Sequence, residues 1–263
     1  MTASEIIQQI KSSHKYRSIC DETIQRITRS KIGQYQSDKA TIKSIKTKLH
    51  QITQAFVSEN SILKANHFLD ELNSKNLNPT VKAILTLHAS SKERLDFAEQ
   101  LYADIFSKVG SHHQTVLDIA CGFNPFLLPT LHLPIKRLIA TDINASSVNL
   151  LNRYFQLINF SGHATSSDIL ETIPNQPVDL CLLFKILPLL EQQQKGFSKT
   201  LINNLPAQHF AITFPTKTLS GKNIGMPHFY RTFITNTLPS SQYDYLLEKS
   251  YPNELLFIIK KSA

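Results

Sequence analysis

The stretch TVLDIACGFNPFLLP, residues 115–129, decides the fold of this chain. An apolar run ends near Asp118 and passes into a turn at Gly122, as a parallel strand does when it enters a nucleotide-binding loop. A pyrophosphate-binding turn carries three glycines, because the phosphates must lie against a helix N-terminus. This turn has a single glycine. We predict that Asn124 caps the helix that follows and that Pro125 lies in its first turn.

Around this turn, short apolar runs alternate with helical stretches. Such alternation predicts a parallel sheet covered by helices on both faces. No helix fits between the last two apolar runs, so we expect the sheet to end antiparallel. We predict strands at 115–119, 137–142, 162–166, 178–184, 209–214, 243–248 and 254–260, and helices at 124–131, 145–159, 189–204 and 226–236. The layout resembles the α/β, Rossmann-like class I methyltransferases that use S-adenosylmethionine.

The N-terminal part of the chain is predicted to be helical. We expect helices at 4–13, 21–35 and 38–57, with Ser4 and Asp21 as caps. Apolar residues recur at three- and four-residue steps in the third helix and form one stripe; they are Ile42, Ile45, Leu49, Ile52 and Phe56. The polar segment 73–80 is expected to be a linker. We therefore predict an N-terminal helical domain at 1–76 and a methyltransferase domain at 77–263, beginning with a helical region at 82–109 that breaks at 89–91.

The charge of the chain is positive and uneven. The net charge is +8 and the pI about 9.3, and residues 1–50 carry ten Lys or Arg against four acids. A basic balance favours polyanions as partners, nucleic acid first. The alternative is a solvated helical surface. The candidate RNA-binding residues here are Lys11, Lys15, Arg17, Lys43, Lys46 and Lys48.

Several classes of protein are disfavoured. The most hydrophobic segment, 180–190, is short and is interrupted by Lys185 and Pro188, so we expect no membrane-spanning helix. The N-terminus lacks the apolar region of a secretory signal, which favours a cytoplasmic protein. Three widely spaced cysteines predict neither a disulfide framework nor a metal site.

The acidic residues that end successive strands indicate the ligand. Asp142 lies 20 residues beyond Gly122, where a carboxylate can accept both hydroxyl protons of a ribose. S-adenosylmethionine has a ribose and no phosphate, so one glycine suffices. Asp168 follows the third strand, where such enzymes place an acid that accepts from the adenine amino group. The alternatives are a buried structural acid for Asp118 and helix caps for Asp142 and Asp168.

The segment after the fourth strand indicates the methyl acceptor. Enzymes that methylate exocyclic amines carry an Asn/Asp-Pro-Pro-aromatic motif there, whereas this chain has Phe184-Lys185 and a single proline. Enzymes that methylate pyrimidine C5 need a cysteine nucleophile. Cys121 and Cys181 are better explained as packing residues. The acceptor is therefore expected to be an atom with a free lone pair.

Several longer motifs resemble one family. CGFNP (121–125), LHASSKER (87–94), FKILPLLE (184–191), FPTKTLSGKNIGM (214–226) and NELLFII (253–259) look like the aminoglycoside-resistance 16S rRNA methyltransferases of the Arm/Rmt group. SSHKYRSICDETIQRI (12–27) and KTKLHQITQAFV (46–57) resemble that group's N-terminal helical domain. The resemblance implies methylation of guanine N7 at position 1405 of 16S rRNA in the assembled 30S subunit. The product blocks gentamicin and kanamycin.

The resemblance and the residue pattern together give a set of site residues. Attack by N7 needs no general base, so Phe184 and Lys185 are expected to position the reactants. An aromatic ring is wanted beside a base turned out of its stack, and Phe123 and Phe184 are the candidates. Arg94 should bind the cofactor carboxylate, unless it forms a surface ion pair with Glu93 or Asp96. The expected cofactor-binding residues are Arg94, Asp118, Ala120, Gly122, Asp142, Ile143, Asp168, Ile169 and Phe184.

The loop after the fifth strand is a second candidate for RNA contact. Lys217, Ser220 and Lys222 are expected to hold RNA phosphates, with an exposed turn as the alternative. Glu254 is expected to cap the site or to order this loop. The family has Gly-Met-Glu-x-Asn-Tyr after the loop, whereas this chain has GMPHFY (225–230).

We expect a monomer that uses S-adenosylmethionine. Two other functions stay open at this point: a methyltransferase for another rRNA or tRNA base, and a non-catalytic RNA-binding protein with this fold.

Overall fold

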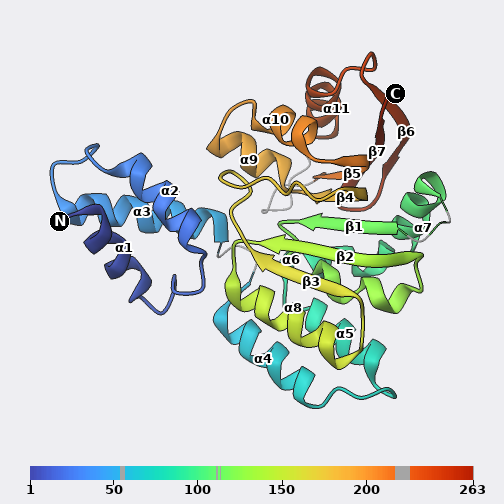
Figure 1. Cartoon of the computed structure of the whole chain (residues 1–263), viewed down its shortest axis with the longest axis horizontal. Coiled ribbons are helices and arrows are strands. Elements are labelled where there is room, and N and C mark those ends of the chain that lie inside the picture. The colour runs from blue at the N-terminus through green and yellow to red at the C-terminus, as the bar shows by residue number, and fades with distance from the viewer. Residues whose placement is uncertain (54–56, 111, 113, 217–225, 263) are drawn as a thin grey trace. The chain divides into compact units, whose positions relative to one another are not determined.

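The computed structural model describes residues 1–53, 57–110, 112, 114–216 and 226–262. Within them, one seven-stranded sheet has the order β3-β2-β1-β4-β5-β7-β6 (Figure 1). β4 pairs in parallel with β1 and β5, whereas β7 is antiparallel to β5 and β6. The strands are β1 Gln114–Ile119, β2 Ile135–Asp142, β3 Gly162–Ser166, β4 Val178–Phe184, β5 Ala207–Pro215, β6 Tyr243–Ser250 and β7 Glu254–Lys261. The predicted fold class is confirmed, and each predicted strand end lies within two residues of the observed one.

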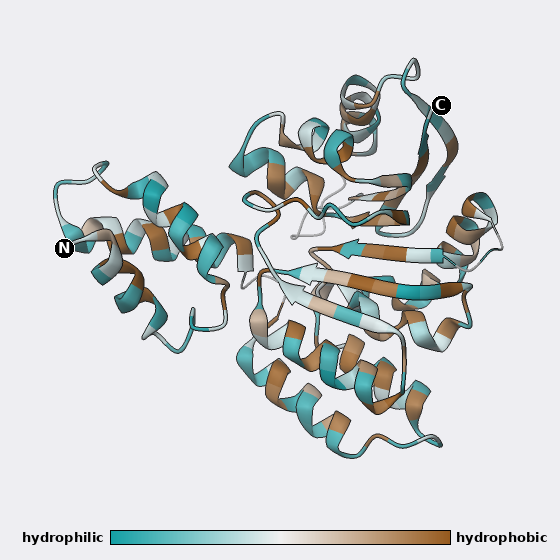
Figure 2. Ribbon diagram, in the orientation of Figure 1, coloured by the Kyte–Doolittle hydropathy of each residue, from teal (hydrophilic) through white to brown (hydrophobic). Residues whose placement is uncertain are grey.

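The central strands contain apolar stretches, which are brown in Figure 2, interrupted by more polar positions in teal. In β4, four consecutive residues from Leu180 to Leu183 are fully buried, and β7 buries six in succession from Glu254 to Ile259. A strand covered on both faces needs no polar alternation. The short apolar runs of the sequence therefore predicted these strands correctly.

Seven α-helices precede β1 in the described chain, and α-helices also separate β2 from β3, β4 from β5 and β5 from β6 (Figure 1). No helix of the described residues has both the length and the apolar character needed to cross a membrane. The α-helices are α1 Ala3–Lys11, α2 Asp21–Lys31, α3 Asp38–Thr53, α4 Glu59–Asp70, α5 Leu77–Leu85, α6 Ala89–Arg94, α7 Ala98–Val109, α8 Ala145–Leu157, α9 Leu187–Gln193, α10 Phe197–Asn204 and α11 Met226–Thr237. Short 3₁₀ helices cover Leu95–Phe97 (η1), Asn124–Phe126 (η2) and Leu128–Leu131 (η3).

The chain divides into two compact units. The first unit contains Met1–Lys92, Gly122–Thr130 and Thr141–Thr172, and the second unit contains the remaining segments, Glu93–Cys121, Leu131–Ala140 and Ile173–Ala263. The predicted boundary after residue 76 stays a prediction.

In the first unit, α1, α2 and α3 form a small apolar core of their own. Ile24 and Ile27 of α2 and Ile45 and Leu49 of α3 are buried there, and Ile42 and Ile52 pack at its edge. The predicted stripe on the third helix is therefore confirmed, except for Phe56, which lies outside the described residues.

Three predicted helices differ from the structure. The helix expected at 124–131 is two 3₁₀ helices, η2 and η3, because Pro125 and Pro129 each remove a backbone donor. The helix expected at 189–204 is broken into α9 and α10 at Gly196, which has φ +81°. The region 82–109 is divided at 86–88 and 95–97, and α6 begins at the residues where a break was expected.

The predicted linker and caps also need correction. The linker at 73–80 is wrong from Leu77 onward, where α5 begins. Thr2 rather than Ser4 caps α1, because Thr2 and Glu5 form a capping box. Cys20 and Phe123 occupy the N-cap positions of α2 and η2, and Asp21 and Asn124 are the first residues of those helices instead.

Candidate active site

The turn after β1 is shaped by a close approach of two elements of the first unit. Gly122 has φ +52°, a conformation that favours glycine. A Cβ atom on Gly122 would lie 2.5 Å from Nε2 of His88. The His88 ring in turn lies 5.3 Å from the ring of Phe123, and the backbone N–H of Ser91 donates to His88 Nδ1 at 3.4 Å. His88 of the LHASSKER motif is therefore a packing partner of the glycine turn.

Asp142 at the end of β2 holds the same turn. Its Oδ2 accepts from the backbone N–H of Gly122 at 2.9 Å, and its Oδ1 accepts from the N–H of Asn144 at 2.8 Å. Burial raises the pKa of the Asp142 carboxyl, and these backbone hydrogen bonds lower it in part. Asn144, not Asp142, caps α8. The side chain is partly exposed, so its oxygens keep capacity for further donors.

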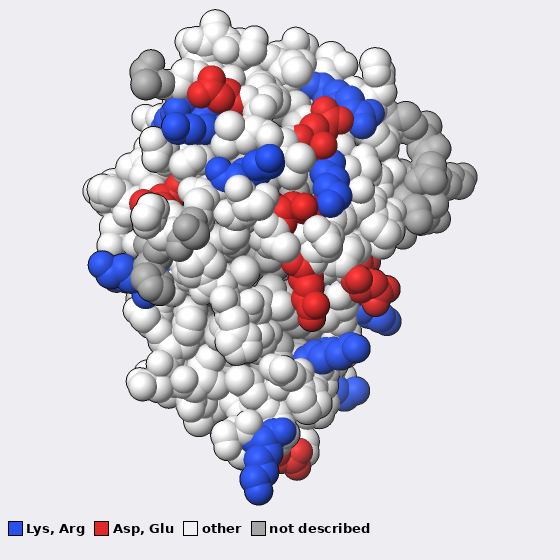
Figure 3. Space-filling view, turned by 90° about the vertical axis from the view of Figure 1, so that its right-hand side faces the viewer, with Lys and Arg blue, Asp and Glu red and all other residues white. Residues whose placement is uncertain are grey.

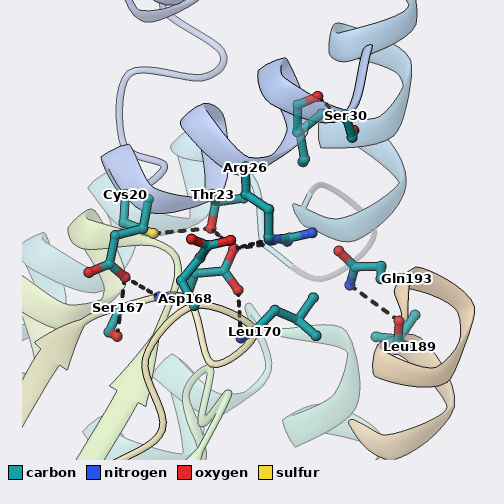
Figure 4. A network of polar contacts seen from close by, with 12 residues as sticks. Cys20, Thr23, Arg26, Ser30, Ser167, Asp168, Leu170, Leu189 and Gln193 are labelled. Carbon is teal, nitrogen blue, oxygen red and sulfur yellow. Dashed lines mark hydrogen bonds and ion pairs between the residues drawn. The ribbon is translucent and has the colours of Figure 1, made fainter. Parts of the chain in front are cut away.

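Asp168, which follows β3, is almost fully buried and is bound to α2 (Figure 4). Its Oδ2 accepts from the hydroxyl of Thr23 at 2.7 Å and from Nε of Arg26 at 2.8 Å. Its Oδ1 accepts from the backbone N–H of Leu170 at 3.0 Å. Ile169, the next residue after Asp168, is buried. In the loop after β2, the backbone C=O of Ile143 accepts from the N–H of Cys20 at 2.8 Å. The sequence did not indicate Thr23 or Arg26, because their partner is more than 140 residues away.

In the second unit, a buried ion pair lies beside an aromatic ring. Nη2 of Arg94 is 2.9 Å from Oε1 of Glu254, and both side chains are almost fully buried. The guanidinium lies 4.6 Å from the ring centroid of Phe184. Burial is the largest influence on the pKa of Arg94 and lowers it, but the charge and hydrogen bond of Glu254 together with the charges of Tyr102 and Asp118 outweigh burial, so the net shift is upward. Arg94 therefore forms a buried ion pair with Glu254, whereas the alternative considered above was a surface ion pair.

Lys185 follows β4 in a left-handed conformation, φ +58°, which is uncommon for a residue with a side chain. Its Nζ lies 2.8 Å from Oε2 of Glu93 and 3.3 Å from Oε1 of Glu254. Glu254 thus serves two cations, Arg94 and Lys185. The carboxylate compensates charges that would otherwise be buried alone.

Asp118, Cys121 and Cys181 are buried residues of the second unit. Asp118 is 1% exposed, and its charge contributes to the raised pKa of Arg94. Ala120, which follows β1, has φ +52°. Burial, assisted by Asp118, raises the pKa of Cys181 well above its usual value. The Cys181 thiol is therefore protonated at neutral pH, which agrees with a packing role rather than a nucleophile.

The candidate aromatic residues have different surroundings. Phe123 is fully buried in the first unit, 5.5 Å from the ring of Phe126, so its ring is part of the core. Phe184 is partly exposed and lies 6.1 Å from Tyr102. In the departure from the family pattern, Tyr230 stacks on Phe214 at 4.6 Å, whereas Phe229 is 63% exposed.

The candidate RNA-binding residues of α1–α3 and the loops between them are exposed or partly exposed. Lys11 pairs with Asp21, and Arg17 pairs with Glu59 at 2.6 Å. Lys15 lies 5.7 Å from the ring of Tyr16. Lys43, Lys46 and Lys48 lie on α3. Lys217, Ser220 and Lys222 lie outside the described residues.

On the face drawn in Figure 3, basic and acidic side chains are interspersed. A surface of mixed sign is typical of a solvated protein and offers no uniform attraction to a polyanion. In the sequence, residues 1–50 carry +6 of the net charge of +8.

Comparison with known proteins gives concordant matches. A family model described as ribosomal RNA methyltransferase (FmrO) matches residues 12–237. A protein of Serratia marcescens named 16S rRNA (guanine(1405)-N(7))-methyltransferase is 33% identical over 263 residues, covering all of both chains. The protein of the same name from Micromonospora echinospora is 26% identical, covering 98% of this chain and 96% of its own.

Solved structures agree. The 16S rRNA methyltransferase RmtF, in complex with S-adenosyl-L-homocysteine, has a TM-score of 0.91 and 31% identity, covering 99% of this chain and 98% of its own. The 16S rRNA methylase RmtB has a TM-score of 0.86 and 31% identity, covering 100% and 99%. The resemblance therefore extends over the whole chain and both units.

Proposed function

The chain belongs to the FmrO family of ribosomal RNA methyltransferases, and from this premise we propose that it transfers a methyl group from S-adenosylmethionine to N7 of guanine 1405 in 16S rRNA. We further propose that it acts as a cytoplasmic monomer on the assembled 30S subunit. The observation that carries the proposal is the end-to-end match to a relative named for that reaction.

The residues of the first unit suit this cofactor. Gly122 has a left-handed backbone and its N–H is bound by Asp142, and a turn with one glycine is enough for a ligand without a pyrophosphate. The Asp142 carboxylate is held in place by two backbone N–H groups and is partly exposed, so it can accept hydrogen bonds from both ribose hydroxyls. Ala120 and Ile143 flank these positions in the chain, and Asp168 and Ile169 are the candidates for the adenine end.

In the second unit, Arg94 is the proposed ligand of the cofactor carboxylate. Its guanidinium carries five N–H donors in a planar fork. Glu254 lies 2.9 Å from Nη2, and a guanidinium is well suited to bind the carboxylate of the cofactor. Asp118 adds negative charge, which suits the cationic sulfonium, and Phe184 and Lys185 flank the end of β4.

For methyl transfer to guanine N7, the protein mainly has to position the base and the cofactor. When bound, S-adenosylmethionine supplies a methyl group that guanine N7 attacks with its lone pair, as the S–C bond breaks and its electron pair stays on sulfur. No proton must leave N7, so no general base is required. Phe184 and Lys185 orient the base, and their contribution is proximity.

RNA binding is assigned to the basic helices and to the loop after β5. Lys11, Lys15, Arg17, Lys43, Lys46 and Lys48 would contact phosphates, which fix position without reading sequence. Lys217, Ser220 and Lys222 are proposed to do the same. In this proposal residues 1–76 form the rRNA-binding domain and residues 77–263 the methyltransferase domain.

The cofactor site is tested by calorimetry with S-adenosylhomocysteine. We expect the wild-type chain to bind and Asp142→Ala to lose binding by at least about tenfold, because a hydrogen-bonded charge is removed. Asp244→Ala, an exposed acid on β6, is the control and should bind normally. Equal binding by Asp142→Ala would remove Asp142 from the site.

The target base is tested on 16S rRNA from cells that express the protein. Borohydride and aniline cleave RNA at N7-methylguanine, so reverse transcription should stop at guanine 1405. Expression should protect against gentamicin but not against apramycin. A stop at another base would indicate a different rRNA target, and binding of cofactor with no modification would indicate a non-catalytic RNA-binding protein.

A further inference from the structure

The loops that follow β2 and β3 are both fastened to the segment 18–29. We propose that Arg26 is a positioning residue that couples rRNA binding on α2 and α3 to cofactor binding, by holding the carboxylate of Asp168. The inference rests on the proposed cofactor site and adds to it that rRNA and cofactor raise each other's affinity.

The Asp168 carboxylate faces two ways. Oδ2 binds α2, through the Thr23 hydroxyl at 2.7 Å and the Arg26 guanidinium, whose Nε and Nη2 are each 2.8 Å away. Oδ1 accepts from the N–H of Leu170 at 3.0 Å, and a carboxylate oxygen can accept about two hydrogen bonds. One oxygen of Asp168 thus holds the helix, while the other keeps capacity for an adenine amino group (Figure 4).

Further hydrogen bonds join the same segments. The carboxylate of Glu22 on α2 accepts from the backbone N–H of Asp168 at 2.8 Å. In the loop after β2, the N–H of Cys20 donates to the C=O of Ile143, and the N–H of Ala145 donates to the C=O of Ser18 at 2.7 Å. The backbone on both sides of Asn144 is therefore bonded to the N-terminal segment.

Arg26 also acts electrostatically on Lys48 of α3. The pKa of Lys48 on α3 is lowered by burial and also by the nearby charges of Lys31 and Arg26. Lys31 and Arg26 on α2 thus repel Lys48 on α3, and a bound phosphate would relieve that repulsion. Arg26 therefore stands between a cationic surface and the carboxylate of Asp168.

This arrangement has a thermodynamic consequence. A phosphate bound at Lys31 and Lys48 fixes α2 and α3, and α2 fixes the loop that presents Asp168. Ordering of the loop by one ligand lowers the entropy that the other must lose, which gives positive coupling. The coupling must be equal in both directions.

The experiment measures S-adenosylhomocysteine affinity with and without saturating unmodified 30S subunits. In the wild type, 30S should raise the affinity about fivefold or more, within the usual range of coupling between sites. Arg26→Gln should weaken binding without 30S about tenfold, because it removes a charged partner from Asp168. The coupling factor should then fall to about one, and Arg26→Lys should restore part of it.

Arg29→Gln is the matched control, since it removes the same charge from the same helix. Arg29 pairs with Glu171 at 2.7 Å on the exposed surface, where such pairs contribute little, so binding should change less than about twofold. Thr23→Val keeps the shape and removes one hydrogen bond to Asp168, and it replaces Arg26→Gln if that variant does not fold. A coupling factor of one in the wild type, or unchanged affinity and coupling in the variants, overturns the inference. Loss of wild-type binding, or normal binding by Asp142→Ala, instead overturns the proposed cofactor site.

Discussion

At the scale of single residues, the turn after β1 depends on a fit between two side-chain positions. Gly122 has a left-handed backbone, and the imidazole of His88 occupies the space that a Cβ atom would need. Conformation and sterics therefore both require glycine there. The proposed ribose ligand Asp142 accepts a hydrogen bond from the same glycine, so a change in the backbone of the turn is expected to displace the Asp142 carboxylate.

We predict that Gly122→Ala lowers the free energy of unfolding by about 2–4 kcal/mol, from the strained φ and the forced shift of His88. It should also weaken S-adenosylhomocysteine binding. Urea unfolding measures the first effect and calorimetry the second. Gly33→Ala is the control: φ is +79° but no atom lies within 4 Å, so only the conformational cost of about 1 kcal/mol should be seen. Equal losses in the two variants would show that the contact with His88 is unimportant.

The pKa of Asp142 predicts how cofactor binding depends on pH. Burial raises this pKa above its ordinary 3.8. Only the ionised carboxylate accepts from both ribose hydroxyls, and protonation dominates below the pKa. S-adenosylhomocysteine affinity should therefore fall on acidification, beginning at a higher pH than for an exposed aspartate.

Calorimetry from pH 7.5 downward, within the range where circular dichroism shows a folded chain, measures this dependence. Asp142→Asn should bind weakly with little change over the same range. A wild-type profile as flat as that of the variant would contradict the assignment.

At the scale of elements, α3 presents an apolar face to the small N-terminal core and basic residues elsewhere. Ile45 and Leu49 are buried in that core, whereas Lys43 is exposed and Lys46 partly exposed. An amphipathic helix of this kind can carry a nucleic-acid surface without losing its packing.

We predict that Lys43→Glu with Lys46→Glu weakens 30S binding about tenfold or more and leaves cofactor affinity unchanged, because two phosphate contacts become repulsive. Lys48 is left intact because it lies near Arg26. Filter binding with labelled 30S subunits measures the effect. Lys108→Glu with Lys136→Glu makes the same charge change at exposed positions outside this domain. If both pairs weaken binding equally, net charge rather than the basic helix is responsible.

The elements also show how far the sequence could be interpreted. All seven strands were predicted, and the most buried of them, β4 and β7, are the clearest cases because they are continuous apolar runs. The helix at 124–131 was wrong, since two prolines left only 3₁₀ turns. The breaks near Gly196 and at 86–88 depend on backbone angles and tertiary contacts, which periodicity does not report.

The site was predictable to a similar degree. Positions at strand ends, such as Asp118, Asp142 and Asp168, follow from topology, so spacing located them. Their partners do not: Glu254 with Arg94, and Arg26 with Asp168, are joined by folding across more than 140 residues of chain. Arg94 was predicted from the resemblance to the family, whereas no local sequence pattern predicted a role for Arg26.

At the scale of the whole molecule, the charge predicts the salt dependence of each binding step. The chain carries a net +8, of which residues 1–50 hold +6. Binding of the protein to rRNA phosphates releases counterions, whereas binding of the zwitterion S-adenosylhomocysteine releases few. We expect 30S affinity to fall by about 10²-fold or more between 50 and 200 mM salt, with S-adenosylhomocysteine affinity nearly constant.

Filter binding over a salt series gives the slope of log affinity against log salt. Lys43→Glu with Lys46→Glu should reduce the steepness of that slope by at least about 1.4, which corresponds to two lost phosphate contacts. A slope that is the same in the variant would place the contacts on other residues.

The hydrogen bond between Thr23 and Asp168 also bears on the order in which the protein is made. The two residues are 145 positions apart, so α2 leaves the ribosome long before its anchor is synthesised. At about 5–20 residues per second, the interval is roughly 7–30 s. During that time α1, α2 and α3 have their own apolar core to hold them. The segment that holds the proposed cofactor loops is thus synthesised first, and its contact with Asp168 can form only after residue 168 has been synthesised.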